Sequence, residues 1–138
     1  MEFEDSKLNL LLEKINESEY TKAITNFLKE YPEYRYRFDK KEGNVAFRCI
    51  NKNNKKCLIV NSDLGNIPEF FSNIFDKVVS LDIPEKILIQ KARLESKKIN
   101  NIFFDICKPG YIPSIENNFD LIIVNGIQIQ DLQNNLKD

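Results

Sequence analysis

The fold of this chain is decided by residues 56–82, which read KCLIVNSDLGNIPEFFSNIFDKVVSLD. Residues 57–60 form a short, unbroken apolar run, which predicts a strand buried on both faces. Residues 61–66 have the composition of a turn, and apolar side chains with the spacing of one helix face then follow at Ile67, Phe70, Phe71 and Ile74. Residues 78–81 predict a second buried strand, which ends at Asp82.

This stretch is therefore predicted to be a β-loop-α-β unit, with a polar loop after its first strand and an acid after its second. In a parallel sheet the loop and the acid would both lie at the carboxyl edge, where sheets of this kind bind ligands. The pattern indicates a site for a nucleotide-type cofactor. We expect this site to be damaged, because the loop that binds a nucleotide after the first strand is usually rich in glycine, and residues 61–66 contain a single one.

Composition favours a single globular unit without a strong electrostatic field. The 138 residues suit one domain, and a net charge of −1 with both signs interspersed would not recruit nucleic acid or an acidic membrane. No apolar stretch approaches the ~18 residues that a membrane span needs. The first residues, MEFED, do not resemble a signal peptide. We expect a cytoplasmic protein.

Histidine is absent from the sequence, and the three cysteines, Cys49, Cys57 and Cys107, are scattered without metal-ligand spacing. Neither a disulfide framework nor a metal site is expected. The lack of histidine also removes the commonest general base and any Ser-His or Cys-His pair. Chemistry would have to use carboxylates, Tyr, Lys or a cofactor that is itself reactive, and the sequence identifies no catalytic residue.

The N-terminal part is predicted to begin with two amphipathic helices. The first spans about residues 6–17, and its apolar stripe consists of Leu8, Leu11, Leu12 and Ile15. The second is capped by Ser18, ends at Pro32 and has a buried side made of Tyr20, Ile24, Phe27, Leu28 and Tyr31. These helices could cover one edge of the sheet, cap a cofactor pocket or pack on another chain.

A β-hairpin is predicted next, because residues 34–38 and 45–50 alternate between apolar and polar side chains around a polar turn. Its polar face would gather Arg35, Arg37 and Arg48. Like charges on one strand face repel unless an anion lies between them, so this face could bind phosphate or single-stranded nucleic acid. The alternative is a plain solvated surface.

Strands and helices alternate through the rest of the chain, which predicts an α/β fold with a mostly parallel, doubly wound sheet. Further strands are predicted at residues 101–106 and 119–124, and helices at residues 84–98 and 128–136. The inner side of the longer helix would consist of Ile87, Leu88, Ala92 and Leu94. We expect residues 1–51 to hold the helices and hairpin and residues 52–138 the sheet, in one compact unit.

From Lys56 to about Ile127 the order of elements resembles the class I S-adenosylmethionine-dependent methyltransferases. In the members that it resembles most, the first loop reads G-x-G-x-G-N and a later signature reads F-D-L-I-I-x-N-G. The matching stretches are LGNI at 64–67, VVSLD at 78–82, KAR at 91–93, NI at 101–102 and FDLIIVNG at 119–126. The resemblance covers about half of the chain and implies a Rossmann-like methyltransferase core.

The resemblance also implies a cofactor, S-adenosylmethionine, and a role for the matched positions near its methionine half. The first loop would pass close under that half of the cofactor. Its positions are Asn61, Ser62, Asp63 and Gly65. Asn125, past the fourth strand, would lie near the transferred methyl group and the substrate.

The adenosine half of the cofactor would contact the next two strand ends. Asp82 would accept hydrogen bonds from both ribose hydroxyls, which suits a carboxylate with two oxygens. Ile83 would pack on the adenine ring. Asp105 would accept a hydrogen bond from the adenine amino group, with Ile106 nearby.

The first loop departs from the family pattern at two glycines, which are Asn61 and Asp63 here. Asn and Asp tolerate positive φ better than other side chains, so the turn is expected to keep its shape. The Asp63 carboxylate would lie near the cofactor's own carboxylate, and two such charges about 4 Å apart repel by about 4 kcal/mol. That repulsion is roughly a thousandfold in affinity. Ile59 replaces an acid that would pair with the cofactor's ammonium group.

The expected function is a methyltransferase-like domain acting on an unknown small molecule, sugar or lipid, with weakened or lost activity. In an active enzyme the cofactor supplies the chemistry and the protein orients the reactants. The altered loop disfavours catalysis by this chain alone. The chain also ends before a further strand and hairpin of the family, so it would be either a natural abbreviation or a fragment.

Two other functions remain open. One is an inactive methyltransferase-fold scaffold that binds a protein partner, or forms a homodimer, through an exposed sheet edge. The other is a nucleotide- or anion-binding module that uses Arg35, Arg37 and Arg48.

Overall fold

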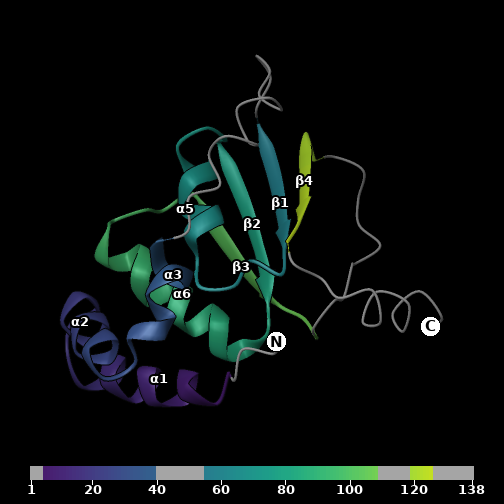
Figure 1. Ribbon diagram of the computed structural model, residues 1–138. Coiled ribbons are helices and arrows are strands. Elements are labelled where there is room, and N and C mark those ends of the chain that lie inside the picture. Colours follow the sequence, from purple (N-terminus) through teal and green to yellow (C-terminus); the bar gives the residue numbers. More distant parts are fainter. Residues whose placement is uncertain (1–4, 40–54, 109–118, 126–138) are drawn as a thin grey trace.

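A computed structural model of the protein describes residues 5–39, 55–108 and 119–125 (Figure 1). Within these residues, four strands form one parallel sheet in the order β3-β2-β1-β4. The strands are β1 (Lys56–Val60), β2 (Lys77–Asp82), β3 (Ile102–Ile106) and β4 (Leu121–Val124). The four predicted strands and their parallel arrangement are therefore confirmed.

The order of the strands places a topological switch point between β1 and β4. Helix α5 (Asn66–Ser72) joins β1 to β2, and helix α6 (Pro84–Ser96) joins β2 to β3. The chain thus moves outward from β1 to β3 and then returns to the other side of β1, where β4 pairs with it. Ligand sites of open parallel sheets lie at such a reversal, outside the carboxyl ends of the strands.

The central strands are buried on both faces, as their unbroken apolar runs predicted. On one face Cys57, Ile59 and Val78 pack with Ile67 and Phe71 of α5 in the main hydrophobic core. On the other face a smaller cluster consists of Leu58, Val60 and Leu81. Because Val60 is level with both Leu81 and Val124, the carboxyl ends of β2, β1 and β4 meet at one edge.

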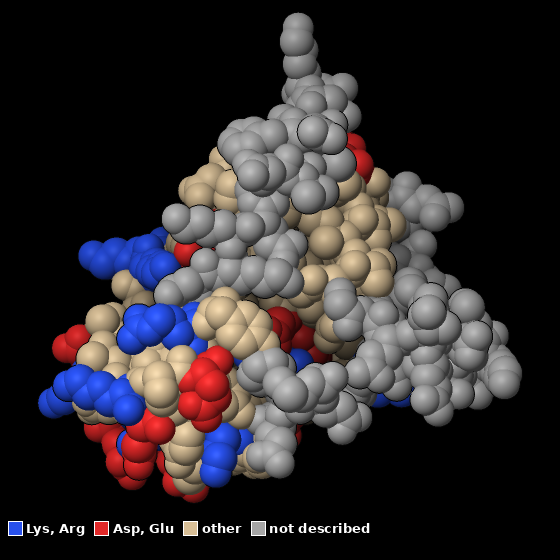
Figure 2. Space-filling model, in the orientation of Figure 1, with Lys and Arg blue, Asp and Glu red and all other residues tan. Residues whose placement is uncertain are grey.

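The two predicted N-terminal helices are α1 (Leu8–Glu17), which follows a short 3-10 turn η1 (Asp5–Lys7), and α2 (Tyr20–Glu30). They pack against α6 rather than on an edge of the sheet (Figure 1). Leu8, Leu11 and Phe27 form a second core there with Ile89 of α6. On the face drawn in Figure 2, acidic and basic side chains are interspersed over this helical layer.

Helix α6 lies between two layers, and this changes which of its side chains are buried. Leu88, predicted on the inner side, is 53% exposed. Ile87 and Leu94 are buried as predicted, and Gln90 and Arg93 are buried as well. A prediction with one apolar stripe assumes one buried face. Helix α6 contacts the sheet on one side and α1 on the other, so Gln90 and Arg93 are buried outside the predicted stripe.

The predicted β-hairpin is wrong in its first strand. Residues 34–38 lie in a 3-10 turn, η2 (Pro32–Tyr34), and a short helix, α3 (Arg35–Asp39). Tyr34 and Phe38 are four residues apart and both buried, whereas Tyr36 between them is 51% exposed. A five-residue alternation fits this helical spacing as well as it fits a strand. The second predicted strand, residues 45–50, and the predicted last helix lie outside the described residues.

Two smaller features complete the description of the fold. Ser18 does not cap α2; its hydroxyl donates to the Lys14 carbonyl at the end of α1. Within the part of the chain that the structure describes, no helix has both the length and the apolar character needed to cross a membrane.

Candidate functional site

The loop after β1 contains a single glycine and has positive φ at three of its residues. Asn61 has φ 60°, Asp63 has φ 57° and Gly65 has φ 102°, so three residues of this loop are left-handed. Asn61 and Asp63 thus adopt the positive φ that these residue types were expected to tolerate. Gly65 is also closely packed, since a Cβ at this position would lie 3.2 Å from Cγ of Gln90 and the Gln90 side chain would have to shift.

A buried polar network fixes this loop to β2 and α6. The Ser80 hydroxyl donates to Oε1 of Gln90 at 2.7 Å and lies 2.6 Å from Oγ of Ser62. Nε2 of Gln90 donates to Oγ of Ser62 at 2.8 Å and to the Asp63 carbonyl at 2.6 Å. Ser62, Ser80 and Gln90 are all buried. Ser62 is therefore a structural member of the loop, held by two residues that the sequence did not single out.

Asp82 lies at the end of β2 and is 2% exposed. Its Oδ2 accepts a hydrogen bond from the Asp63 amide and its Oδ1 accepts one from the Ile83 amide, each at 2.7 Å. Burial raises the pKa of this carboxyl, and the charge of Asp63 adds to the effect, against the opposing influence of Lys86 and of the two amides. Asp82, the acid predicted to end this strand, is thus buried and bound to the backbone of the first loop.

The Asp63 side chain is bound by two cations from different helices. Nη2 of Arg37 lies 2.6 Å from Oδ1 and Nε lies 3.3 Å from Oδ2, and Nζ of Lys86 lies 3.2 Å from Oδ1. Burial alone would raise the pKa of Asp63, but the hydrogen bonds and charges of Arg37 and Lys86 outweigh it and hold this pKa below its ordinary value. The Asp63 charge is compensated, whereas the sequence suggested an uncompensated one.

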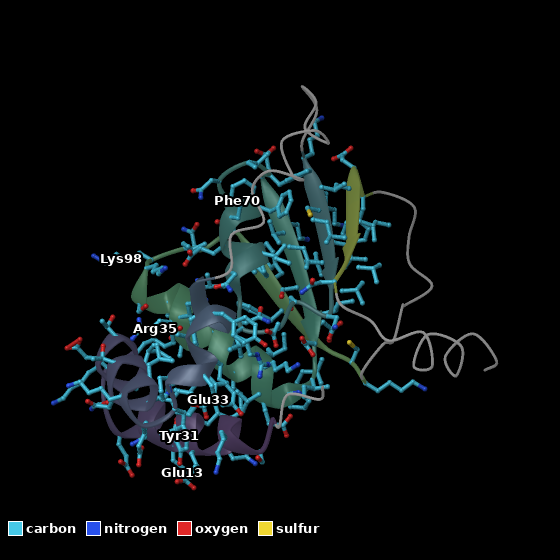
Figure 3. All side chains as sticks on the ribbon, viewed as in Figure 1. Glu13, Tyr31, Glu33, Arg35, Phe70 and Lys98 are labelled. Carbon is cyan, nitrogen blue, oxygen red and sulfur yellow. The ribbon has the colours of Figure 1, made fainter. Side chains whose placement is uncertain are left out.

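Arg35 and Arg37, two of the three arginines predicted to form an anion-binding face, do not lie together on a strand. Arg37 is 6% exposed and turns inward to Asp63, while its guanidinium also lies 5.6 Å from the centre of the Tyr34 ring. Arg35 is exposed on α3, among the helices and not on a strand (Figure 3). Arg48 lies outside the described residues. The predicted face depended on a strand at residues 34–38, and the helix there separates Arg35, which is exposed, from Arg37, which is buried.

The ends of β2 and β3 bring four predicted site residues together. Asp82 is level with Ile106, and Leu81 is level with Asp105. Asp105 is exposed, and its Oδ1 accepts a hydrogen bond from the Ile106 amide at 2.8 Å. Ile106 is 57% exposed, and Ile83 beside Asp82 is half-buried. A carboxylate and apolar side chains therefore face solvent at this part of the edge.

Asn61 and Asn125 join the first loop to the end of β4 across the switch point. Nδ2 of Asn61 donates to the Asn125 carbonyl, and Nδ2 of Asn125 donates to the Asn61 carbonyl at 3.3 Å. Both amides are thus engaged with backbone. Asn125 lies at the edge where it was expected, and its NH₂ group serves to hold the loop.

Arg93 supports the loop from α6 and belongs to the KAR stretch at residues 91–93. It is 6% exposed, and its Nη1 donates to the Leu64 carbonyl at 3.3 Å. Its Nε also lies 3.4 Å from Oε1 of Glu69. Burial alone would raise the pKa of Glu69, but Lys97 and Arg93 lower it below its ordinary value.

The described cysteines are poor nucleophiles. Burial raises the pKa of Cys57 to about 12. Burial, together with the charges of Asp82 and Asp105, raises the pKa of Cys107 to about 11. Both thiols stay protonated at neutral pH, and the thiolate is the reactive form. Among residues 5–39, 55–108 and 119–125, no group of acids and cysteines is arranged to hold a metal ion.

Solved structures share this arrangement of strands and helices. The YcgJ protein of Bacillus subtilis matches 59% of this chain with a TM-score of 0.54 at 17% identity. Phosphoethanolamine N-methyltransferase 1 of Haemonchus contortus, solved with phosphoethanolamine and S-adenosylhomocysteine, matches 67% with a TM-score of 0.54 at 16% identity. A methyltransferase candidate from Bacillus halodurans matches 59% with a TM-score of 0.53 at 17% identity. This chain has the class I methyltransferase fold.

The region shared with this chain is a minor part of each of these three proteins. The matching region spans 36% of the Bacillus subtilis chain, 36% of the Bacillus halodurans chain and 20% of the Haemonchus contortus chain. No protein-family model and no curated protein matches the sequence. The identities are low, so the likeness establishes the fold and leaves the ligand to be argued from the site.

Proposed function

We propose that this methyltransferase-fold domain binds the nucleoside part of an S-adenosylmethionine-type cofactor at the ends of β2 and β3. The supporting observation is the position of Asp82, a buried carboxylate at the carboxyl end of β2, next to the exposed Asp105 and Ile106 at the end of β3. Carboxylates with adjacent apolar surface at such an edge suit a ribose and a purine base. Transfer activity of the chain is proposed to be weak or lost.

Each residue would have a definite part in holding the nucleoside. Asp82 accepts two amide hydrogen bonds, and a carboxylate has about four lone-pair positions, so it keeps capacity for ribose hydroxyls. Ile83 and Ile106 would pack against the base, and Asp105 would accept from an exocyclic amino group. The residues therefore fit the nucleoside half of the cofactor.

The other half of the cofactor fits less well, and this is why weak activity is proposed. The amides of Asn61 and Asn125 are bonded to backbone, and Asp63 is held by Arg37 and Lys86. When bound, the sulfonium cofactor supplies an activated methyl group, and the protein orients the acceptor. The described residues provide an orienting surface for the nucleoside and no general base aimed at an acceptor.

Calorimetric titration with S-adenosylmethionine and S-adenosylhomocysteine tests the proposal. We expect saturable binding with a dissociation constant below about 1 mM. Asp105→Ala should weaken it about fivefold, the effect of one lost hydrogen bond. Asp76→Ala is the matched control, because Asp76 is also exposed but lies before the first residue of β2, at the opposite edge. An equal loss of affinity in Asp105→Ala and Asp76→Ala would contradict the placement of the nucleoside at the ends of β2 and β3.

A second candidate function is a scaffold without a nucleoside ligand. It is favoured by one observation: Asp82 is 2% exposed and both of its oxygens already accept backbone hydrogen bonds. Such a domain would bind protein, including a second copy of itself, through β4, where Ile122 is 54% and Val124 45% exposed. Absence of binding at millimolar nucleoside by a cooperatively folded chain, with a dimer in light scattering, would support the scaffold.

A further inference from the structure

The cation pair around Asp63 has the geometry of a carboxylate-binding site that the protein fills itself. Arg37 contacts both oxygens of Asp63, through Nη2 at 2.6 Å and Nε at 3.3 Å. Lys86 contacts Oδ1 at 3.2 Å. A two-pronged guanidinium contact with a second cation is the arrangement that proteins use to recognise carboxylates. Arg37 is itself 6% exposed, so the surrounding fold holds its guanidinium group in place.

The filled site is adjacent to the proposed nucleoside site. The Asp63 amide donates to Oδ2 of Asp82 at 2.7 Å, so one residue connects the two carboxylates. Lys86 acts on both, since its charge lowers the pKa of Asp63 and opposes the raised pKa of Asp82. Because the two acids are adjacent, a nucleoside bound at Asp82 could direct its 5′ substituent toward this cluster.

We infer that Asp63 is a specificity-determining residue that directs the site toward nucleosides whose 5′ substituent lacks a carboxylate. This inference rests on the proposed function. An incoming carboxylate would find Arg37 and Lys86 already bound to Asp63 and would lie beside two acidic side chains. A neutral thioether in the same place meets no such repulsion and needs no cation.

Removal of the Asp63 side chain should open the same cations to an external carboxylate. Glycine is the suitable replacement because it accepts the φ of 57° at this position without strain. The Asp63→Gly chain would retain the backbone amide that bonds to Asp82. The contacts that Arg37 and Lys86 make with the Asp63 carboxylate would then be lost, and a carboxylate from solution or from a ligand could take the place of that side chain.

The experiment compares two nucleosides that differ by a terminal carboxylate. The probes are 5′-methylthioadenosine and 5′-(2-carboxyethylthio)adenosine, which carries the acid and no amine. Each is titrated into the wild-type chain, into Asp63→Gly and into Asp76→Gly, which removes an equal charge at the opposite sheet edge. Wild type and Asp76→Gly should bind the neutral probe at least about threefold more tightly. Asp63→Gly should reverse the order and bind the acidic probe about tenfold better than wild type does.

A second readout does not depend on nucleosides. Thermal melts of Asp63→Gly in sodium formate should show a higher melting temperature than melts in sodium chloride of equal ionic strength. Wild type and Asp76→Gly should melt at the same temperature in both salts. Equal melting of Asp63→Gly in the two salts would overturn the claim that Arg37 and Lys86 form a carboxylate site.

The outcomes separate this inference from the function on which it rests. Equal or tighter binding of the acidic probe by wild type would overturn the inference and leave nucleoside binding in place. Failure of both probes to bind any of the three chains would overturn the proposed function, because it would exclude nucleosides as the ligand class. Reversal of the preference in Asp63→Gly alone would support both.

Discussion

The carboxyl edge of the sheet divides into two halves that use polar residues in opposite ways. The closed half is the loop of residues 61–65 with Asp82 beneath it, and the open half consists of Asp105 and Ile106 at the end of β3. In the closed half Asp82 is 2% exposed and bonded to backbone, whereas in the open half Ile106 is 57% exposed. Both halves follow strands of one sheet, so position at the edge does not by itself make a residue a ligand contact.

The difference teaches that the closed half contributes to stability whether or not a ligand is bound, whereas the open half contributes little to stability. Buried hydrogen-bonded groups are costly to remove, because the partners they leave behind stay unpaired. Exposed side chains can be replaced at little cost to folding and can matter only through what they touch. Substitutions in the closed half should therefore change the free energy of unfolding in addition to any effect on binding, and those in the open half should change ligand affinity alone.

The largest effect is expected for Asp82→Ala in the closed half. This change leaves the amides of Asp63 and Ile83 without their acceptor, and we expect a loss of about 3 kcal/mol in the free energy of unfolding. Urea denaturation measures it. Asp105→Ala is the matched control, since its exposed carboxylate accepts one local amide. A loss of similar size in both variants would remove the distinction between the halves.

Gly65→Ala should cost about 2 kcal/mol, because alanine is strained at positive φ and its Cβ would press on the buried Gln90. The same denaturation experiment measures the loss. Unchanged stability would mean that the loop can adopt another turn, and the closed half would then be less rigid than its hydrogen bonds indicate.

Asp63→Asn should lower the free energy of unfolding by about 1 kcal/mol at pH 7, since the amide cannot pair with Arg37 and Lys86 as a carboxylate does. The folded-state pKa of Asp63 lies below its ordinary value. Its contribution is therefore complete above about pH 4, the ordinary carboxyl pKa, and is lost as pH falls through the lowered value. Unfolding of both chains from pH 7 to pH 2 should show the gap close only in acid. A gap that is constant with pH would contradict this ion pairing.

The smallest stability effect is expected for Ile106→Ser in the open half. The side chain is 57% exposed, so the free energy of unfolding should change by less than about 0.5 kcal/mol. Affinity for S-adenosylhomocysteine should nevertheless fall about threefold, since apolar contact with the base is lost. Calorimetry and denaturation of the same sample check both statements. Unchanged affinity would exclude the open half as the surface that binds the base.

Much of the fold could be predicted because buried parallel strands have a recognisable sequence pattern, a short and mostly apolar run. The runs at residues 57–60, 78–81, 101–106 and 119–124 are short, apolar and bounded by polar residues, and each corresponds to an observed strand. The alternation at residues 34–38 was too short to separate a strand from a helix whose Tyr34 and Phe38 share one face. Tyr34 and Phe38 are buried against residues of α1 and α2. Tertiary contacts of this kind decide the structure where the local sequence pattern is ambiguous.

The site was predicted where residues follow strands and missed where partners come from distant elements. Asp82, Asp105 and Asn125 could be placed because parallel strands end at one edge. The partners of Asp63 could not, since Arg37 lies 26 residues away in the sequence and on a segment whose structure was predicted wrongly. Gln90 also carries no local signal; a single Gln in a helix becomes informative once its burial is known.

The central claim is that a nucleoside binds the open half and leaves the closed half in place. Its most direct test is to follow backbone amide signals by nuclear magnetic resonance during titration with 5′-methylthioadenosine, which is practical for a chain of 138 residues. We predict saturable shifts at Ile83, Asp105 and Ile106, with the amide of Gly65 nearly unchanged. Shifts confined to α1 and α2, or none at about 5 mM nucleoside, would contradict the account.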